Sequence, residues 1–125
     1  MNFLLLTPEM VEEIHDRVLN AGELQGRALN KSLEGALGRV DNRLAYGMIE
    51  DCFDLAAAYA VALATGHVFN DANKRTAYRA MLVCLYLNGI RLDHDVEEAG
   101  TIIIQTAQRL IDEETLDDWL RQKAV

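Results

Sequence analysis

The chain has 125 residues, half of them hydrophobic, and a formal net charge of −8. This length predicts a single domain over 1–125, with enough apolar residues for a core that needs no disulfide or structural metal. The excess of acids argues against direct nucleic-acid binding, because affinity for a phosphate backbone needs clustered cations. Cys52 and Cys84 lie in apolar runs, so we interpret both as small buried hydrophobes in a reducing compartment.

The hydropathy pattern predicts a cytoplasmic protein that does not enter a membrane. The first residues lack the basic and apolar regions of a signal peptide, and the longest apolar run, Leu55 to Ala64, is too short to span a bilayer. The charges are uneven, because cations dominate from Gly66 to Leu92 and acids from Asp93 to Asp118. A local positive patch on an acidic protein favours a small anionic ligand or an anionic part of a substrate.

Helical periodicity runs through almost the whole sequence, without any long strand-like alternation. We therefore expect a compact all-α domain with two central helices joined by a turn over 65–71. The first predicted element is a helix that begins at Thr7 and Pro8 and is stopped by Gly22, followed by an exposed loop or small hairpin over 22–31 and a short helix over 32–39. A long helix over 42–64 then ends at Gly66, and a second one runs from Asn70 or Asp71 to Leu87 and ends at Asn88-Gly89. The last two helices are predicted over 95–110 and 115–123, and the final one has a capping-box-like start at Thr115.

The stretch His67-Val-Phe-Asn-Asp-Ala-Asn-Lys-Arg-Thr76 concentrates polar groups at the junction of the two central helices. Lys74 and Arg75 fall in the first helical turn, where the macrodipole is already positive and an acid would gain ~0.3–1 kcal/mol. Two cations beside free backbone N–H groups form an anion-binding site suited to phosphate. The alternative is that both cations pair with surface acids.

His67 follows the helix-ending glycine and is a candidate general base, a role that contributes typically ~10²–10⁴-fold in rate. The alternative is a polar residue satisfied at a helix end. His15 and His94 lack such neighbours, and we expect His15 on a solvated helix face and His94 near a helix start.

The remaining residues of the stretch have both structural and chemical interpretations. Asp71 either caps the helix or, as the one carboxylate among the local cations, binds a Mg²⁺ that bridges phosphates. Asn73 can both donate and accept, which suits contacts with phosphate or metal-bound water. Phe69 is expected to be a core anchor. Thr76 faces either a ligand or the helix start.

This stretch resembles the signature of the Fic/Doc superfamily, His-x-Phe-x-(Asp/Glu)-(Gly/Ala)-Asn-(Gly/Lys)-Arg. Lys74 in place of a second glycine, and Tyr78 in place of a further arginine, match the Doc (death-on-curing) toxin branch. The likeness extends over nearly the whole chain and includes Ile14-His15-Asp16 and the segment from Arg43 to Tyr46. Thr65 departs from the pattern, because Doc carries an arginine two residues before the motif histidine.

The resemblance implies a Fic/Doc-type helical domain and a toxin enzyme that uses ATP and Mg²⁺. Most Fic proteins transfer AMP to a hydroxyl, whereas Doc toxins transfer the γ-phosphate to a threonine of elongation factor Tu and so arrest translation. By resemblance, His67 deprotonates the acceptor hydroxyl, Asp71 holds Mg²⁺, and Arg75 completes the catalytic set. The residues expected to bind the nucleotide phosphates are Asn70, Ala72, Asn73, Lys74 and Arg75.

The resemblance also implies how target and inhibitor bind. Family members receive the target in extended form along a flap, and residues 22–31 lie in the matching place. No Ser/Thr-x-x-x-Glu inhibitory pattern is present. We therefore expect inhibition by a Phd-like antitoxin, whose C-terminal segment folds onto the toxin. Two alternatives remain, an AMP transferase that modifies a protein hydroxyl and an inactive antitoxin-binding module or corepressor.

Overall fold

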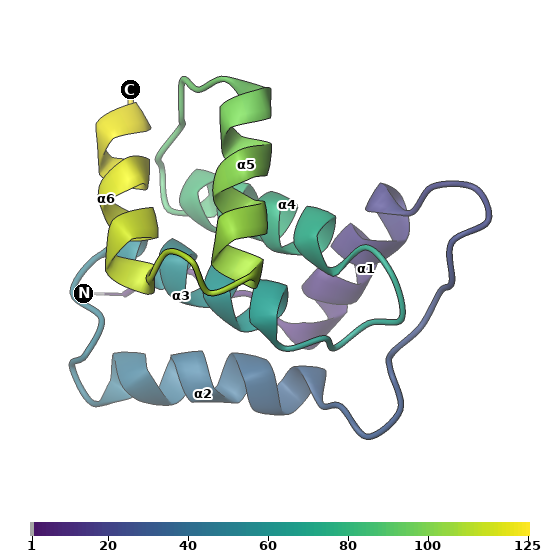
Figure 1. Ribbon diagram of the computed structural model, residues 1–125. Helices are drawn as coiled ribbons and strands as arrows, with labels where there is room; N and C mark the ends of the chain where they lie inside the picture. The colour runs from purple at the N-terminus through teal and green to yellow at the C-terminus, as the bar shows by residue number, and fades with distance from the viewer. Residues whose placement is uncertain (1) are drawn as a thin grey trace.

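The computed structural model describes residues 2–125 and contains six α-helices in that range (Figure 1). Two isolated β-bridges are the only extended pairing among these residues. The predicted all-α fold class is therefore confirmed. The helices are α1 (Pro8–Val18), α2 (Leu33–Ala45), α3 (Cys52–Thr65), α4 (Asn73–Leu87), α5 (Val96–Ala107) and α6 (Glu113–Lys123).

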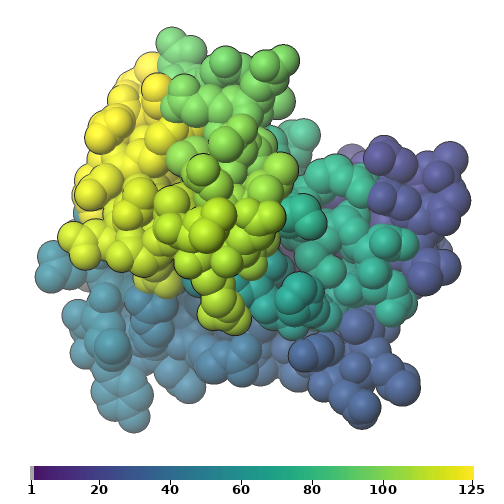
Figure 2. Space-filling model, in the orientation of Figure 1, coloured from purple at the N-terminus to yellow at the C-terminus, as the bar shows by residue number. Residues whose placement is uncertain are grey.

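Helices α3 and α4 form the centre of the molecule and pack against each other more extensively than any other pair. Ala60 on α3 and Ala77 and Ala80 on α4 are fully buried, and such small side chains let two helix backbones approach closely. The other helices cover this pair, with α2 alongside α3 and with α5 and α6 together on one side (Figures 1 and 2). Within 2–125, no helix has the length and apolar character needed to cross a membrane.

The break between α2 and α3 corrects the prediction of a short helix over 32–39 and a long one over 42–64. Helix α2 continues to Ala45, and the chain then turns through Gly47, whose φ is +74°. Asp51 opens α3 by accepting the N–H of Asp54 at 2.9 Å. The sequence thus contains two signals for this break, a glycine and an N-cap aspartate. The prediction missed them because the apolar pattern of the long helix was given more weight.

Other predicted helix ends are partly confirmed. Thr7 caps α1, and Gly66 and Asn88 are the C-caps of α3 and α4. The predicted start at Thr115 was wrong, because Asp112 caps α6 and its Oδ1 accepts both the N–H and the hydroxyl of Thr115, at 2.8 and 2.7 Å.

The two cysteines are free thiols with different environments. Cys84 is fully buried on α4, and burial raises the pKa of its thiol to about 12. Its interpretation as a small buried hydrophobe is confirmed. Cys52, at the start of α3, is only half-buried, and burial raises its pKa less.

Candidate functional site

The loop between α3 and α4, residues 66–72 and called the motif loop below, is held by hydrogen bonds from α4 and α1. Asn73 binds the backbone of Phe69 twice: its Oδ1 accepts the N–H at 3.0 Å and its Nδ2 donates to the carbonyl at 2.9 Å. His15 lies with Nε2 2.8 Å from the Asp71 carbonyl, and its ring stacks on Phe69 with centroids 3.9 Å apart. A carbonyl only accepts, so Nε2 of His15 carries a proton.

Residues 22–31, called the flap segment below, pair with the motif loop along one edge. The predicted loop is confirmed, while the hairpin alternative was wrong, because the bridge of this segment joins Arg27 to Phe69 outside it. The bonds are Ala28 N–H to the Val68 carbonyl (2.7 Å), Asn70 N–H to the Gly26 carbonyl (3.2 Å) and Leu24 N–H to Asp71 Oδ2 (2.8 Å).

The start of α4 lacks the side-chain cap predicted for it. Its N-cap is Ala72, while Asp71 accepts from the flap segment and the Asn70 amide donates to flap carbonyls at 3.3–3.4 Å. Without a cap, the first backbone N–H groups of α4 remain available to a ligand. Every other described helix begins with a side chain that accepts a backbone N–H: Thr7, Ser32, Asp51, Asp95 and Asp112.

Left-handed backbone conformations gather around the same loop. A non-glycine residue in this region costs on the order of 1 kcal/mol or more, and such strain concentrates at functional sites. For Arg109, which follows the C-terminus of α5, the favourable interaction of its charge with the helix dipole, ~0.3–1 kcal/mol, does not exceed this cost. The non-glycine residues with positive φ among 2–125 are Asn30 (+62°), His67 (+50°), Ala72 (+64°) and Arg109 (+61°).

Gly66 is required for space rather than for φ, which is an ordinary −80°. A Cβ at this position would lie 2.6 Å from the Ala62 carbonyl oxygen. The left-handed turn falls one residue later, on His67. The His67 side chain is exposed and forms no hydrogen bond to any residue from 2 to 125, so its imidazole is accessible from solvent.

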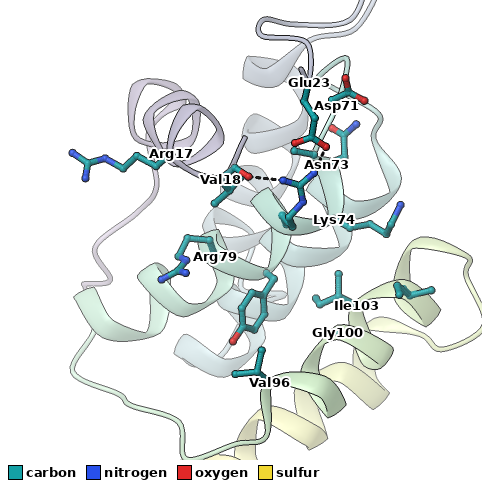
Figure 3. Close-up of a pocket in the computed structure, with 14 residues that line it drawn as sticks. Arg17, Val18, Glu23, Asp71, Asn73, Lys74, Arg79, Val96, Gly100 and Ile103 are labelled. Atoms are coloured by element: carbon teal, nitrogen blue, oxygen red, sulfur yellow. Dashed lines mark hydrogen bonds and ion pairs between the residues drawn. The ribbon is translucent and has the colours of Figure 1, made fainter. Parts of the chain in front are cut away.

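A cavity of about 710 Å³, called the first cavity below, opens beside the start of α4. Helices α1, α4 and α5 and the flap segment form its walls, and Figure 2 shows the hollow between α5 and α1. In Figure 3, Glu23 and Asp71 lie toward one end and Val96 toward the other, while the lining from α5, which includes Gly100 and Ile103, is apolar along its length. A cavity of this size, with cations from α4 and an apolar wall from α5, suits a ligand that combines an anionic and an apolar part.

Lys74 and Arg75 differ in their partners, although both line the first cavity. Arg75 donates to the carboxylate of Glu23 and to the carbonyl of Val18 (Figure 3). This contact holds the pKa of Glu23 below its ordinary value and raises that of Arg75. Lys74 is exposed and forms no ion pair with a residue of the described chain. The alternative interpretation, in which both cations pair with acids, thus holds for Arg75 and, within residues 2–125, not for Lys74.

Asp71 is the carboxylate of the first cavity that fits a divalent cation. Its Oδ2 accepts from Leu24, while its Oδ1 has no hydrogen-bond partner among residues 2–125. Glu23, the other acid of the lining, is already bound to Arg75. Mg²⁺ in proteins is commonly held by one or two carboxylates together with substrate phosphates and water, so a single available carboxylate is sufficient.

A separate group of carboxylates lies far from this cavity. Oxygens of Asp51, Asp54 and Asp117 lie within 4.8 Å of one another at the N-terminal end of α3, whereas the motif loop follows its C-terminal end. Arg121 already bridges these acids. Helix α3 has 14 residues, so about 20 Å separate the two ends. This cluster cannot share a cation with Asp71.

His15 is the site residue that the sequence interpretation placed wrongly. It is 1% exposed, not solvated, and it holds the motif loop through Phe69 and Asp71. The signal was present, because His15 follows the fully buried Val11 by four residues and therefore shares its helix face. Phe69 is 3% exposed, so its predicted role as a core anchor is confirmed.

The chain is similar to known proteins over the region that carries this site. Residues 5–85 match the model of the Fic/DOC family, a range that includes the motif loop and most of α4. "Protein kinase doc" of Escherichia phage P1 is 37% identical over 118 residues, which cover 94% of this chain and 93% of that protein. "Toxin Doc" of Mycolicibacterium smegmatis is 41% identical over 59 residues, 46% of this chain and 45% of that protein.

Proposed function

We propose that this chain, which belongs to the Fic/DOC family, is a Doc-type toxin that transfers a phosphate group from ATP to a protein hydroxyl. The names of the two relatives, a protein kinase and a toxin, support this assignment. The observation that carries it is the start of α4, which no side chain caps and where Lys74 forms no ion pair within residues 2–125, at a cavity with an apolar wall on α5. In this proposal the motif residues have the roles expected from the sequence, except for those whose side chains are already hydrogen-bonded within the protein.

The first cavity is the proposed site of the donor nucleotide. The anionic phosphates bind Lys74, the free backbone N–H groups of residues 73–75 and, further along α4, Arg79. Adenosine then lies against the apolar wall formed by α5. Arg75 takes part only by exchanging Glu23 for phosphate, so its contribution to nucleotide affinity is smaller than that of Lys74.

Asp71 is the proposed ligand of the Mg²⁺ that accompanies ATP. The cation supplies neutralisation of the charge that develops on the transferred group. The chain itself fixes the position of Asp71 through Leu24 N–H on its carboxylate and His15 on its carbonyl. Asn73 likewise holds the motif loop through the backbone of Phe69, and Asn70 holds the flap segment through its backbone carbonyls. Ala72 contributes only its backbone.

His67 is the proposed general base, which accepts the proton of the acceptor hydroxyl at an imidazole nitrogen. Its side chain is exposed and forms no hydrogen bond within residues 2–125, and the hydrogen bonds between Asn73 and Phe69 set the position of its loop. Phosphoryl transfer depends mainly on positioning and on charge stabilisation, so a fixed loop beside the phosphate site is the main requirement.

The protein acceptor is proposed to bind along the flap segment in the cytoplasm. One edge of the segment pairs with the motif loop through Gly26 and Ala28, and this leaves the N–H of Arg27 on the opposite edge for an extended peptide. By family resemblance, we assign the acceptor as a threonine of elongation factor Tu. The same resemblance assigns a Phd-like antitoxin, through its C-terminal segment, as the inhibitor.

The direct test is to incubate the purified protein with elongation factor Tu, Mg²⁺ and ATP labelled at the γ or the α position. The proposal expects γ-label on the acceptor and a mass increase of one phosphate on a threonine. Label from the α position would replace it with AMP transfer. No label from either position, with antitoxin binding intact, would support the inactive binding module.

A further inference from the structure

A second cavity, of about 640 Å³, lies on the other side of the motif loop, between α2, α3 and the turn after α5. Its floor is apolar and includes Val40, Val61 and Val68, while its rim carries cations from three separate segments. These are Lys31, Arg39, Arg43 and Arg109. The only acid in the lining is Glu113.

Most of the positive charge on this rim is not neutralised. Glu113 is bound by Arg43 through two hydrogen bonds, of 3.1 and 2.6 Å. Lys31, Arg39 and Arg109 are exposed and form no ion pair with any residue in the described range. In a chain with a net charge of −8, three unpaired cations around one hollow produce a local potential that attracts an anionic group.

Two of the rim residues adopt left-handed backbone conformations without being glycine. Asn30 has φ +62° and Arg109 has φ +61°. Arg109 follows the C-cap of α5, a position that glycine occupies with less strain. Keeping an arginine there is explained if its side chain binds something at the cavity rim.

The second cavity is adjacent to the proposed acceptor path. Gly66 and Val68, the chain neighbours of His67, both line it, whereas Asp71 to Arg75 line the first cavity. The flap segment connects the two, because Glu23 lines the first cavity and Asn30 the second. A peptide that pairs with the flap segment and presents a hydroxyl to His67 therefore continues toward the cationic rim.

We propose that the second cavity docks an acidic stretch of the protein acceptor that flanks the modified hydroxyl. The proposal rests on the proposed function for the identity of the occupant. A nucleotide fits this cavity less well, since the one carboxylate is already bound and the N-terminus of α2 is capped by Ser32. An acidic peptide can pair its carboxylates with the cations on the rim, and an extended chain fits a cavity that is open to solvent.

The test uses Arg39→Gln, Arg109→Gly and the double variant of both. Arg109→Gly removes a cation and also relieves the left-handed strain, so it leaves the fold intact. Arg91→Gln is the matched control, because Arg91 is exposed and forms no ion pair within the described chain but lies beyond α4, outside both cavities.

The first measurement is phosphate transfer from γ-labelled ATP to elongation factor Tu. We expect the double variant to raise the KM for the acceptor about ten-fold or more, with an unchanged KM for ATP and an unchanged kcat. Arg91→Gln is expected to behave as the unmodified chain. Equal acceptor KM values for the double variant and the control would overturn the proposal, as would a loss confined to antitoxin affinity.

The second measurement does not depend on catalysis. A fluorescent octaglutamate peptide should bind the unmodified chain at low salt, bind the double variant at least about ten-fold more weakly, and bind Arg91→Gln normally. Equal binding to all three proteins would refute the docking site, whatever the enzyme does. Selective peptide binding without any transfer to elongation factor Tu would refute the proposed function and retain the docking site for acidic peptides.

Discussion

The two central helices begin in opposite ways. Helix α3 starts at Asp51, whose side chain caps the backbone, and Asp54 in its first turn is an acid where the helix dipole favours one. Helix α4 starts at Ala72, in a strained conformation and without a cap, and its first turn carries Lys74 and Arg75. Asp51 and Ala72 are both half-buried, so the difference is not one of burial.

The difference separates stability from ligand binding. The start of α3 is of the kind that stability alone favours. Asp51 caps the backbone at Asp54, and Arg121 forms ion pairs with both acids. The start of α4 gives up both the cap and the dipole match, and it leaves backbone donors and Lys74 open to the first cavity. We therefore expect substitutions at the α3 start to change stability, and substitutions around the α4 start to change activity.

The largest expected effect is that of His67→Ala, beside the start of α4. If His67 is the general base as proposed, its loss should lower the rate of phosphate transfer by ~10²–10⁴-fold and abolish growth arrest on expression. Because the His67 side chain makes no hydrogen bond within residues 2–125, stability and antitoxin binding should not change. Single-turnover labelling and a growth assay measure this, and undiminished toxicity would contradict the assigned base.

Lys74→Glu should have opposite effects on affinity and stability. Replacing the unpaired cation with an acid should weaken ATP binding by about ten-fold or more, while a better dipole match should add ~0.3–1 kcal/mol to the free energy of unfolding. Lys74→Gln is the neutral control and should lie between. Nucleotide titration and urea unfolding check both, and a destabilised Lys74→Glu protein would argue against the functional origin of this lysine.

Asp51→Ala should produce the reverse pattern at the α3 start. Loss of the cap and of the contact with Arg121 should lower the free energy of unfolding by about 1–2 kcal/mol. Activity per folded molecule should stay the same, because the substitution is a helix length away from the motif loop. Asp51→Asn keeps a capping oxygen and is the matched control. A fall in kcat measured below the unfolding transition would show that the two ends are coupled.

The last prediction concerns the pH dependence of stability near the same end, where no single substitution is needed to see an effect. Burial, followed by the hydrogen bond to Asp54, raises the pKa of Asp117 to about 7, with Arg121 opposing the shift. The folded chain therefore holds a proton that the unfolded chain releases above about pH 4, so stability should fall as pH rises from 4 to 7.

Asp117→Asn isolates this contribution, because an amide donates to Asp54 at every pH. The unmodified chain should lose about 1 kcal/mol per pH unit relative to the variant between pH 5 and 7, in urea unfolding at matched ionic strength. Parallel curves for the two proteins would show that Asp117 carries its charge throughout.

Much of the architecture could be predicted from residue patterns that act locally. The all-α class and most helix ends follow from periodicity and from residues such as Thr7, Gly66 and Gly89, whose effects depend on their own turn of chain. The break at Gly47 was missed, because the local signal competed with a stronger apolar pattern around it. The spacing of polar groups between His67 and Thr76, together with its resemblance to a family signature, predicted the candidate site, since those groups fall within one short stretch of chain.

By itself, the sequence determined the helical class, the junction that carries the motif and the identity of its charged and titratable groups. Only the tertiary structure decided how these groups are used: Arg75 is paired with Glu23, Lys74 forms no ion pair within residues 2–125, and a buried His15 and the flap segment hold the motif loop through Asp71. The reason is physical. Capping and periodicity depend on neighbours within about four residues, whereas these contacts join segments of α1, the flap and α4 that only the packed core brings together.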